Sequence, residues 1–125
     1  MKKVLFFPLV LISCFCLAQD AKKIIGKPIK IGNLLVAQND FPIMMRWSDA
    51  KSACADLGDG WRLPTKYELN ILYENKDKIG GFKTYYYWSS TENYNTFGAW
   101  KQNFTTGKQR NINNDKHDVR AVRNF

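Results

Sequence analysis

Histidine and cysteine are scarce in this 125-residue sequence, which has one histidine, His117, and three cysteines. Cys14 and Cys16 lie in an apolar N-terminal segment, so a chain that loses this segment keeps Cys54 alone and forms no internal disulfide. One histidine also leaves few ways to build a zinc site or a nucleophile–histidine pair, because both need several partners. The core must therefore hold by packing, for which the chain has 14% aromatic residues.

Long hydrophobic runs are also absent. The apolar stretch from Val4 to Leu17 is shorter than the roughly 20 residues that span a bilayer. It follows a positively charged start and precedes Ala18, which predicts a signal peptide over residues 1–18. An alternative is a lipoprotein cleavage box at Leu11–Cys14, with a lipid on Cys14. Both interpretations export the protein to the periplasm, the cell surface or the medium, and only the second anchors it to a membrane.

Acidic residues are fewer than basic ones. The whole chain has a formal net charge of +8, and residues 19–125 keep 17 basic and 11 acidic residues, a net charge of +6. No run of Lys or Arg exceeds two residues, so no nucleic-acid partner is predicted. A basic exported domain favours anionic partners such as acidic glycans, but scattered charge of this size also simply keeps a protein soluble. The composition leaves both interpretations open.

The segment after the signal peptide predicts a polar lead-in, a strand and a helix. Residues 19–29 form the lead-in, and residues 30–38 have the β-branched content of a strand, with a turn or bulge at Gly32. Apolar residues then recur every three or four positions, which predicts a helix with Ser48 as N-cap and Gly58 as its stop. The inward face of this helix consists of Trp47, Ala50, Cys54 and Leu57.

A second helix is predicted after Pro64. Thr65 and Glu68 have the spacing of a capping box, in which each side chain accepts a hydrogen bond from the other residue's backbone N–H. Lys76–Lys78 and Gly80–Gly81 are expected to end the helix. Its inward stripe consists of Leu69, Leu72 and Tyr73.

The remainder of the chain predicts short strands between polar turns, at residues 85–90, 99–104, 108–112 and 118–125. The fold class is therefore α+β, with two helices packed on a small antiparallel sheet that comes mostly from the C-terminal half. Residues 30–125 are expected to form one domain.

Arg62 is unusual because it lies between Trp61 and Leu63, directly before the second helix. A guanidinium group in such surroundings needs a carboxylate or several carbonyl groups as hydrogen-bond acceptors, and its stem can pack on aromatic rings. We expect Arg62 to tie the loop between the helices to the sheet. Direct contact with a ligand is the alternative.

Four ordered motifs carry a family resemblance: WxxAxxxC at 47–54, GWRLPTxxEL at 60–69, YWSSTE at 87–92 and VRAVR at 119–123. From Ile31 to Phe125 the chain resembles the bacterial family named for the C-terminal domain of the Legionella collagen-like adhesin. That family is related to the C-type-lectin-like fold of formylglycine-generating enzymes. The resemblance implies this fold, export, and ligand or surface binding, but no defined reaction. Many relatives have a cysteine where this chain has Ala121, so a bridge to Cys54 is absent.

The pattern and the resemblance together assign structural roles to nine residues: Trp47, Cys54, Trp61, Arg62, Pro64, Thr65, Glu68, Trp88 and Arg120.

Residues 93–118 are rich in Asn, with Tyr, Thr and Lys between them. They resemble the variable segments that diversity-generating retroelements rewrite in C-type-lectin-like proteins, which implies a ligand surface here. Ordinary Asn-rich turns are the alternative, because Asn favours turns in any case. The predicted ligand-binding residues are Asn93, Tyr94, Asn95, Lys101, Asn103, Lys108, Arg110, Asn111 and Asn113.

Catalytic chemistry has little support in the sequence. Asp115, His117 and Asp118 lie close together, but Lys116 between them disfavours a metal site. Ser89 lacks the surrounding motif of a nucleophile elbow. The Glu92–Asn93 pair lacks the proline found between such residues in calcium-dependent sugar-binding lectins, so no metal or other cofactor is predicted.

The sequence thus predicts an exported, non-catalytic module that binds a glycan or a surface protein, with an adhesive role at the bacterial envelope. A structural envelope component without a ligand is the second hypothesis. An envelope enzyme that uses Cys54 or His117 is the third.

Overall fold

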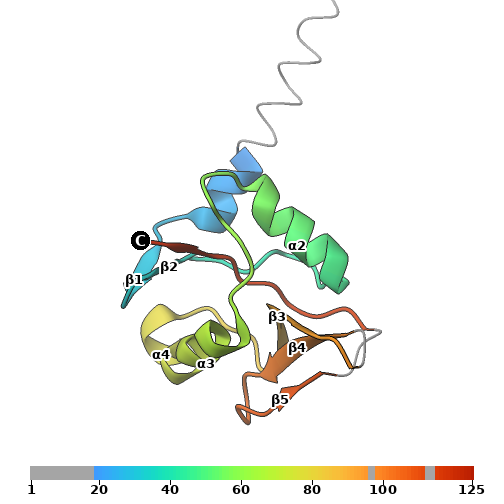
Figure 1. The fold of residues 1–125 in the computed structure, drawn as a ribbon. Helices are drawn as coiled ribbons and strands as arrows, with labels where there is room; N and C mark the ends of the chain where they lie inside the picture. The colour runs from blue at the N-terminus through green and yellow to red at the C-terminus, as the bar shows by residue number, and fades with distance from the viewer. Residues whose placement is uncertain (1–18, 96–97, 112–114) are drawn as a thin grey trace, which may run out of the picture.

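The computed structural model describes residues 19–95, 98–111 and 115–125. The predicted signal peptide and Asn113 lie outside these ranges. The fold is mixed α+β, as the sequence predicts, but it contains two three-stranded antiparallel sheets rather than one (Figure 1). The labelled elements are β1 (Ile29–Ile31), β2 (Leu34–Val36), α2 (Trp47–Asp56), α3 (Lys66–Glu74), α4 (Lys76–Ile79), β3 (Tyr86–Asn93), β4 (Gly98–Asn103), β5 (Gln109–Arg110) and β6 (Val122–Asn124).

The first sheet has the order β1-β2-β6 and joins distant parts of the chain. The predicted strand over residues 30–38 is a hairpin, because Gly32 adopts a φ of 58° and turns the chain between β1 and β2. The predicted lead-in also differs, since residues 19–25 are helical and bury Ile24 in the core. Among the described residues, no helix is long and apolar enough to cross a membrane.

Helix α2 presents the apolar face that the sequence predicts. Ala50 and Cys54 are fully buried in a core cluster, and Trp47 and Leu57 pack against it. Ser48 is not the N-cap, because the helix begins at Trp47 and Arg46 occupies the cap position without a side-chain hydrogen bond. The helix ends before Gly58, which donates its N–H to the carbonyl of Ala55 and adopts a φ of 79° that turns the chain out of the helix.

Helix α3 begins with the predicted capping box. Thr65 Oγ1 accepts a hydrogen bond from the Glu68 backbone N–H, and Glu68 Oε1 accepts one from the Thr65 N–H. Leu69 and Leu72 are buried in the second core cluster. Lys76–Lys78 does not end the helical segment as predicted, because Lys76–Ile79 forms a further short helix, α4, before Gly80.

The second sheet has the order β3-β4-β5 and lies beside α3 (Figure 1). Its β3–β4 register shifts between Trp88 and Glu92, so the two ends of β3 follow different side-chain alternations. Of the predicted strand at 118–125, only β6 is regular.

Residues 117–122 connect the two sheets through main-chain hydrogen bonds. His117 pairs with Met45, Asp118 with Tyr87, and Val122 with Arg62. All six residues of this segment are buried. We call residues 117–122 the central segment, because α2, α3 and both sheets are held around it.

Candidate binding site

The predicted ligand surface lies on β3, β4, β5 and their turns. Two of the predicted asparagines there accept hydrogen bonds from nearby backbone N–H groups. Asn93 Oδ1 accepts a hydrogen bond from the Asn95 N–H at 3.0 Å. Asn103 Oδ1 accepts hydrogen bonds from the N–H groups of Thr105 and Thr106, at 2.8 and 3.1 Å. These side-chain oxygens therefore form Asx turns, which leaves less of each amide for a ligand.

Lys101 is buried rather than displayed on the surface, with 6% of the residue exposed. Its Nζ lies 2.9 Å from His117 Nε2 and 4.6 Å from the centroid of the Tyr86 ring. A protonated lysine only donates, so Nε2 accepts and the histidine is neutral with its proton on Nδ1. Burial, followed by the charge of Lys101, lowers the pKa of His117 to about 4. This pair belongs to the interior of the domain.

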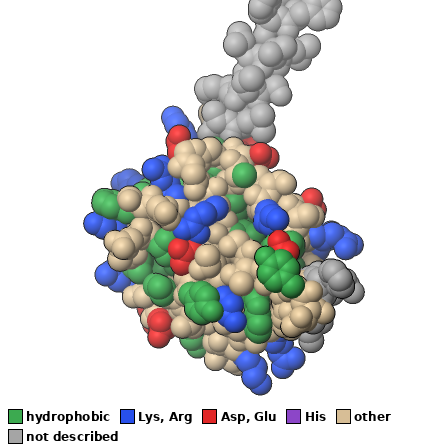
Figure 2. All heavy atoms as spheres, in the orientation of Figure 1, with side chains coloured by type: hydrophobic (Ala, Val, Ile, Leu, Met, Phe, Trp, Pro, Cys, Tyr) green, Lys and Arg blue, Asp and Glu red, His purple; other side chains and the backbone are tan. Residues whose placement is uncertain are grey.

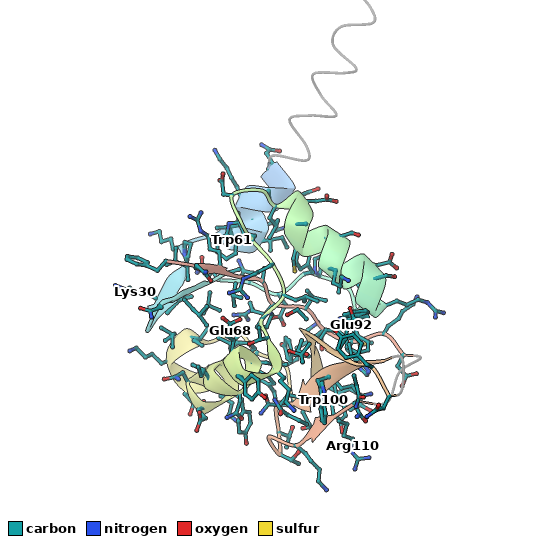
Figure 3. All side chains as sticks on the ribbon, in the orientation of Figure 1. Lys30, Trp61, Glu68, Glu92, Trp100 and Arg110 are labelled. Atoms are coloured by element: carbon teal, nitrogen blue, oxygen red, sulfur yellow. The ribbon has the colours of Figure 1, made fainter. Side chains whose placement is uncertain are left out.

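The remaining predicted ligand residues are mostly displayed. Tyr94 is 83% exposed, and Asn95, Lys108 and Arg110 are also exposed. Asn111 is half-buried. Trp100 and Arg110 lie at the same end of the molecule, over β4 and β5 (Figure 3).

Three side chains at the start of α3 and on β4 form a platform that sequence analysis did not assemble. Lys66 Nζ lies 3.6 Å from the centroid of the Trp100 ring and 5.7 Å from that of Tyr67. Tyr67 is 73% exposed and Trp100 is half-buried. We call Lys66, Tyr67 and Trp100 the aromatic platform. In the space-filling view, hydrophobic side chains flank a basic one over this part of the surface (Figure 2).

Side-chain amides fix the aromatic platform to the sheet. Gln109 Nε2 donates to the Lys66 carbonyl at 2.7 Å and to Gln102 Oε1 at 3.2 Å. Gln102, which is fully buried, donates in turn to Asn70 Oδ1 and to the Gly107 carbonyl. The Lys66 N–H donates to Thr91 Oγ1. Because β3, β4, β5 and α3 all take part, the first turn of α3 is held in place.

Arg62 ties the loop before α3 to the first sheet. Its guanidinium donates to both carboxylate oxygens of Glu68, at 2.7 and 3.0 Å, and to Asn124 Oδ1 on β6 at 2.6 Å. The side chain is 35% exposed, so it is less enclosed than the sequence suggests. Its hydrogen bonds are the first cause of the lowered pKa of Glu68.

Arg120 is the deeply buried guanidinium of the domain, with a fully buried side chain. Its Nε donates to Asp40 Oδ1 at 2.7 Å, and its terminal nitrogens donate to the carbonyls of Ala37 and Gly80. Its Cζ also lies 4.1 Å from the centroid of the Phe82 ring. This cluster fixes the central segment to the loops on both sides of it.

The other residues with predicted structural roles are also inside. Trp61, Pro64 and Trp88 are buried, and Trp47 Nε1 donates to the Ser89 carbonyl. Burial raises the pKa of Cys54 to about 12, so its thiol stays protonated at neutral pH. Across the parts of the chain that the structure describes, no three His, Cys, Asp or Glu side chains are grouped to hold a metal ion.

Comparison with known proteins gives the family. The sequence model of the Lcl C-terminal domain matches residues 27–123. The chain belongs to the Lcl C-terminal domain family. This confirms the resemblance to the adhesin domain that the four motifs indicate, and Cys54 and Ala121 lie in the same buried cluster. No curated protein sequence matches the chain.

The structural comparison confirms a C-type-lectin-like fold for this Lcl domain. One similar solved chain comes from a complex between a mutant von Willebrand factor A1 domain and botrocetin. The TM-score is 0.55 at 13% sequence identity, and the match covers 80% of this chain and 98% of the other. At this identity the likeness concerns the fold alone.

Proposed function

We propose that this Lcl domain is an exported, non-catalytic binding module that recognises an anionic glycan through the aromatic platform and the neighbouring β4–β5 turn. The observation that carries the proposal is the position of Lys66 against the Trp100 ring, beside the exposed ring of Tyr67, where side-chain amides hold the start of α3 to the sheet.

The chemistry of the aromatic platform suits a sugar. Aromatic rings offer flat apolar faces to the C–H faces of a pyranose, and few other exposed side chains do so with little loss of conformational entropy. The Lys66 ammonium supplies a donor for hydroxyl or acidic groups at the same place. Lys108 and Arg110 are exposed on the neighbouring turn and edge strand, where they add positive charge for an anionic polymer.

The absence of a catalytic role is part of the proposal. The Cys54 thiol is buried and protonated, and Nε2 of His117 accepts a hydrogen bond from Lys101. The Cys54 thiol is therefore not ionised as a nucleophile would be, and the basic nitrogen of His117 is already occupied by the Lys101 ammonium instead of a substrate proton. Both observations support a binding function over an envelope enzyme.

A variable surface at residues 93–118 remains part of the proposal in narrower form. The exposed side chains of Tyr94, Asn95, Lys108 and Arg110 are free to change without loss of packing. Asn103 and Lys101 support the fold and are expected to stay constant. Sequences of sister copies test this, and variation at Lys101 as great as at Tyr94 would contradict it.

A glycan array with purified protein tests the function. Tyr67→Ala and Lys66→Ala should each weaken binding at least about tenfold, with thermal stability nearly unchanged in Tyr67→Ala because Tyr67 is exposed, and only slightly lowered in Lys66→Ala because Lys66 is half-buried. Tyr85→Ala is the matched control, since Tyr85 is 59% exposed but lies outside the aromatic platform. Charge reversal by Lys108→Glu and Arg110→Glu should weaken binding to acidic glycans in particular.

Equal binding by Tyr67→Ala, Lys66→Ala and the parent protein would refute the aromatic platform as the site. Binding to surface proteins on a parallel protein array, with no glycan bound, would refute the glycan assignment.

A further inference from the structure

A second apolar feature lies at the end of the molecule formed by residues 19–25 and α2, which are side by side in Figure 1. There a cleft of about 600 Å³ opens between residues 19–25, residues 39–45 and α2. Its lining is mainly apolar and includes Ile24, Phe41, Met45, Ala53 and Leu57. The volume lies within the range of protein sites that enclose a ligand or an inserted side chain, and the cleft shares no residue with the aromatic platform.

The edge of this cleft is an exposed apolar loop, which we call the lip, at Pro42–Met44. Ile43 is 67% exposed and Met44 is 48% exposed. Main-chain hydrogen bonds fix both ends of the lip: the Phe41 N–H donates to the Val119 carbonyl, and Met45 pairs in both directions with His117. The lip is therefore fixed at the edge of the cleft, where Pro42 and Ile43 form part of its wall.

The opposite wall is also fixed. The Asn39 N–H donates to the Ile24 carbonyl, and Asn39 Nδ2 donates to the Lys23 carbonyl at 2.8 Å. The rim carries charges of both signs. Lys23, Asp20 and Asp56 all line the cleft and are exposed. A rim of mixed sign suits a protein surface with its own mixed charges better than an anionic lipid surface.

We propose that the partner of this cleft is a second copy of the same chain. A hollow and a protruding apolar lip on one face are self-complementary, because a two-fold axis between two copies places each lip in the cleft of the other. Because each rim carries Lys23 as well as Asp20 and Asp56, opposite charges are available on the two facing rims. The dimer leaves both aromatic platforms free, so two sites act together on a polymeric ligand.

Sedimentation velocity on the purified protein over a wide concentration range tests this inference. The parent protein should form a dimer whose dissociation constant rises at least about tenfold in Ile43→Asp and in Met44→Asp, because each places a charge in an apolar contact. Both side chains are exposed in the single chain, so the variants should keep the parent melting temperature at concentrations where all the proteins are monomers. Tyr85→Asp, at a comparably exposed aromatic residue far from the cleft in sequence, should leave the dimer unchanged.

Three results would overturn the proposal. The parent protein is a monomer at every concentration up to the millimolar range, or the dimer persists in both lip variants. Alternatively, the monomer floats with vesicles of anionic phospholipid and Ile43→Asp abolishes flotation, which would assign the lip to a membrane. Because these readouts do not involve glycans, they are independent of the test of the aromatic platform.

Discussion

The buried pair of Lys101 and His117 predicts a specific loss of stability in acid. In the folded protein, burial and the charge of Lys101 hold the pKa of His117 at about 4, against an ordinary value of 6.5, and Asp115 opposes this only in part. In the unfolded chain the imidazole is exposed to water and has its ordinary pKa. Below pH 6.5 the unfolded chain therefore takes up a proton that the folded protein excludes.

The size of the effect follows from the two pKa values. Each pH unit between them is worth about 1.4 kcal/mol, so the full gap corresponds to roughly 3 kcal/mol. Stability should be constant near pH 7.5, fall as the pH drops from about 6.5 to 4, and lose no more through this residue below pH 4. This is a large share of the 5–15 kcal/mol typical of a domain.

Urea unfolding followed by tryptophan fluorescence at pH 7, 6, 5 and 4 measures the effect. His117→Gln is the matched variant, because a glutamine oxygen still accepts a hydrogen bond from Lys101 but does not titrate. The parent protein should lose about 3 kcal/mol more than the variant between pH 7 and 4. Because the chain has one histidine, the difference above pH 5.5 comes from His117, whereas carboxylates contribute to both proteins at lower pH.

The reasoning fails if the two proteins lose stability in parallel over this range. It also fails if an NMR titration of the folded protein gives His117 a pKa near 6.5.

Two further predictions concern the buried polar contacts. Arg120→Ala should cost about 3–5 kcal/mol in the free energy of unfolding, because it leaves the carboxylate of Asp40 buried without its cation, and Arg123→Ala at a half-exposed position should cost less than about 0.5 kcal/mol. Glu68→Ala should cost about 1–2 kcal/mol, measured by the same urea unfolding, because it removes both the capping box at Thr65 and the partner of Arg62, and an unchanged value would contradict both contacts as sources of stability.

Short-range patterns in the sequence predict the helices well. The capping box of α3 and the buried faces of α2 and α3 depend on residues within one or two turns of each other, so spacing alone indicates them. The start of α2 differs from the prediction. Ser48 is a good cap residue by type, but the helix begins at Trp47, whose indole N–H donates a hydrogen bond to the Ser89 carbonyl. Tertiary contact overrode local preference there.

The binding surface was harder to predict, because it depends on contacts between distant residues. The outward positions of Lys66 and Tyr67 on the second helix follow from the stripe of Leu69 and Leu72, but their closeness to Trp100 depends on how α3 docks on β4. Lysine is a residue type that usually lies at the surface. Lys101 is buried because the central segment places His117 against it. No local pattern contains that information.

The sequence makes Arg62 conspicuous, whereas the fully buried guanidinium is that of Arg120. Arg62 is conspicuous between two apolar residues, yet it is one-third exposed and has its main partner, Glu68, six residues away. Arg120 alternates with apolar residues like any strand position, and its partner Asp40 lies 80 residues away in the chain. The pairing that does most to organise the core therefore has no local signature.

The central segment also governs the order in which the molecule can be assembled. It follows α2, α3 and β3 in the chain, and its carbonyl and N–H groups pair with β3, with Met45 just before α2 and with Arg62 in the segment before α3. During synthesis these earlier elements leave the ribosome before residues 117–122 have been made, so their main-chain partners are still missing. The polypeptide is therefore expected to remain loose and protease-sensitive until residues 117–122 are available, and then to close in a single late step.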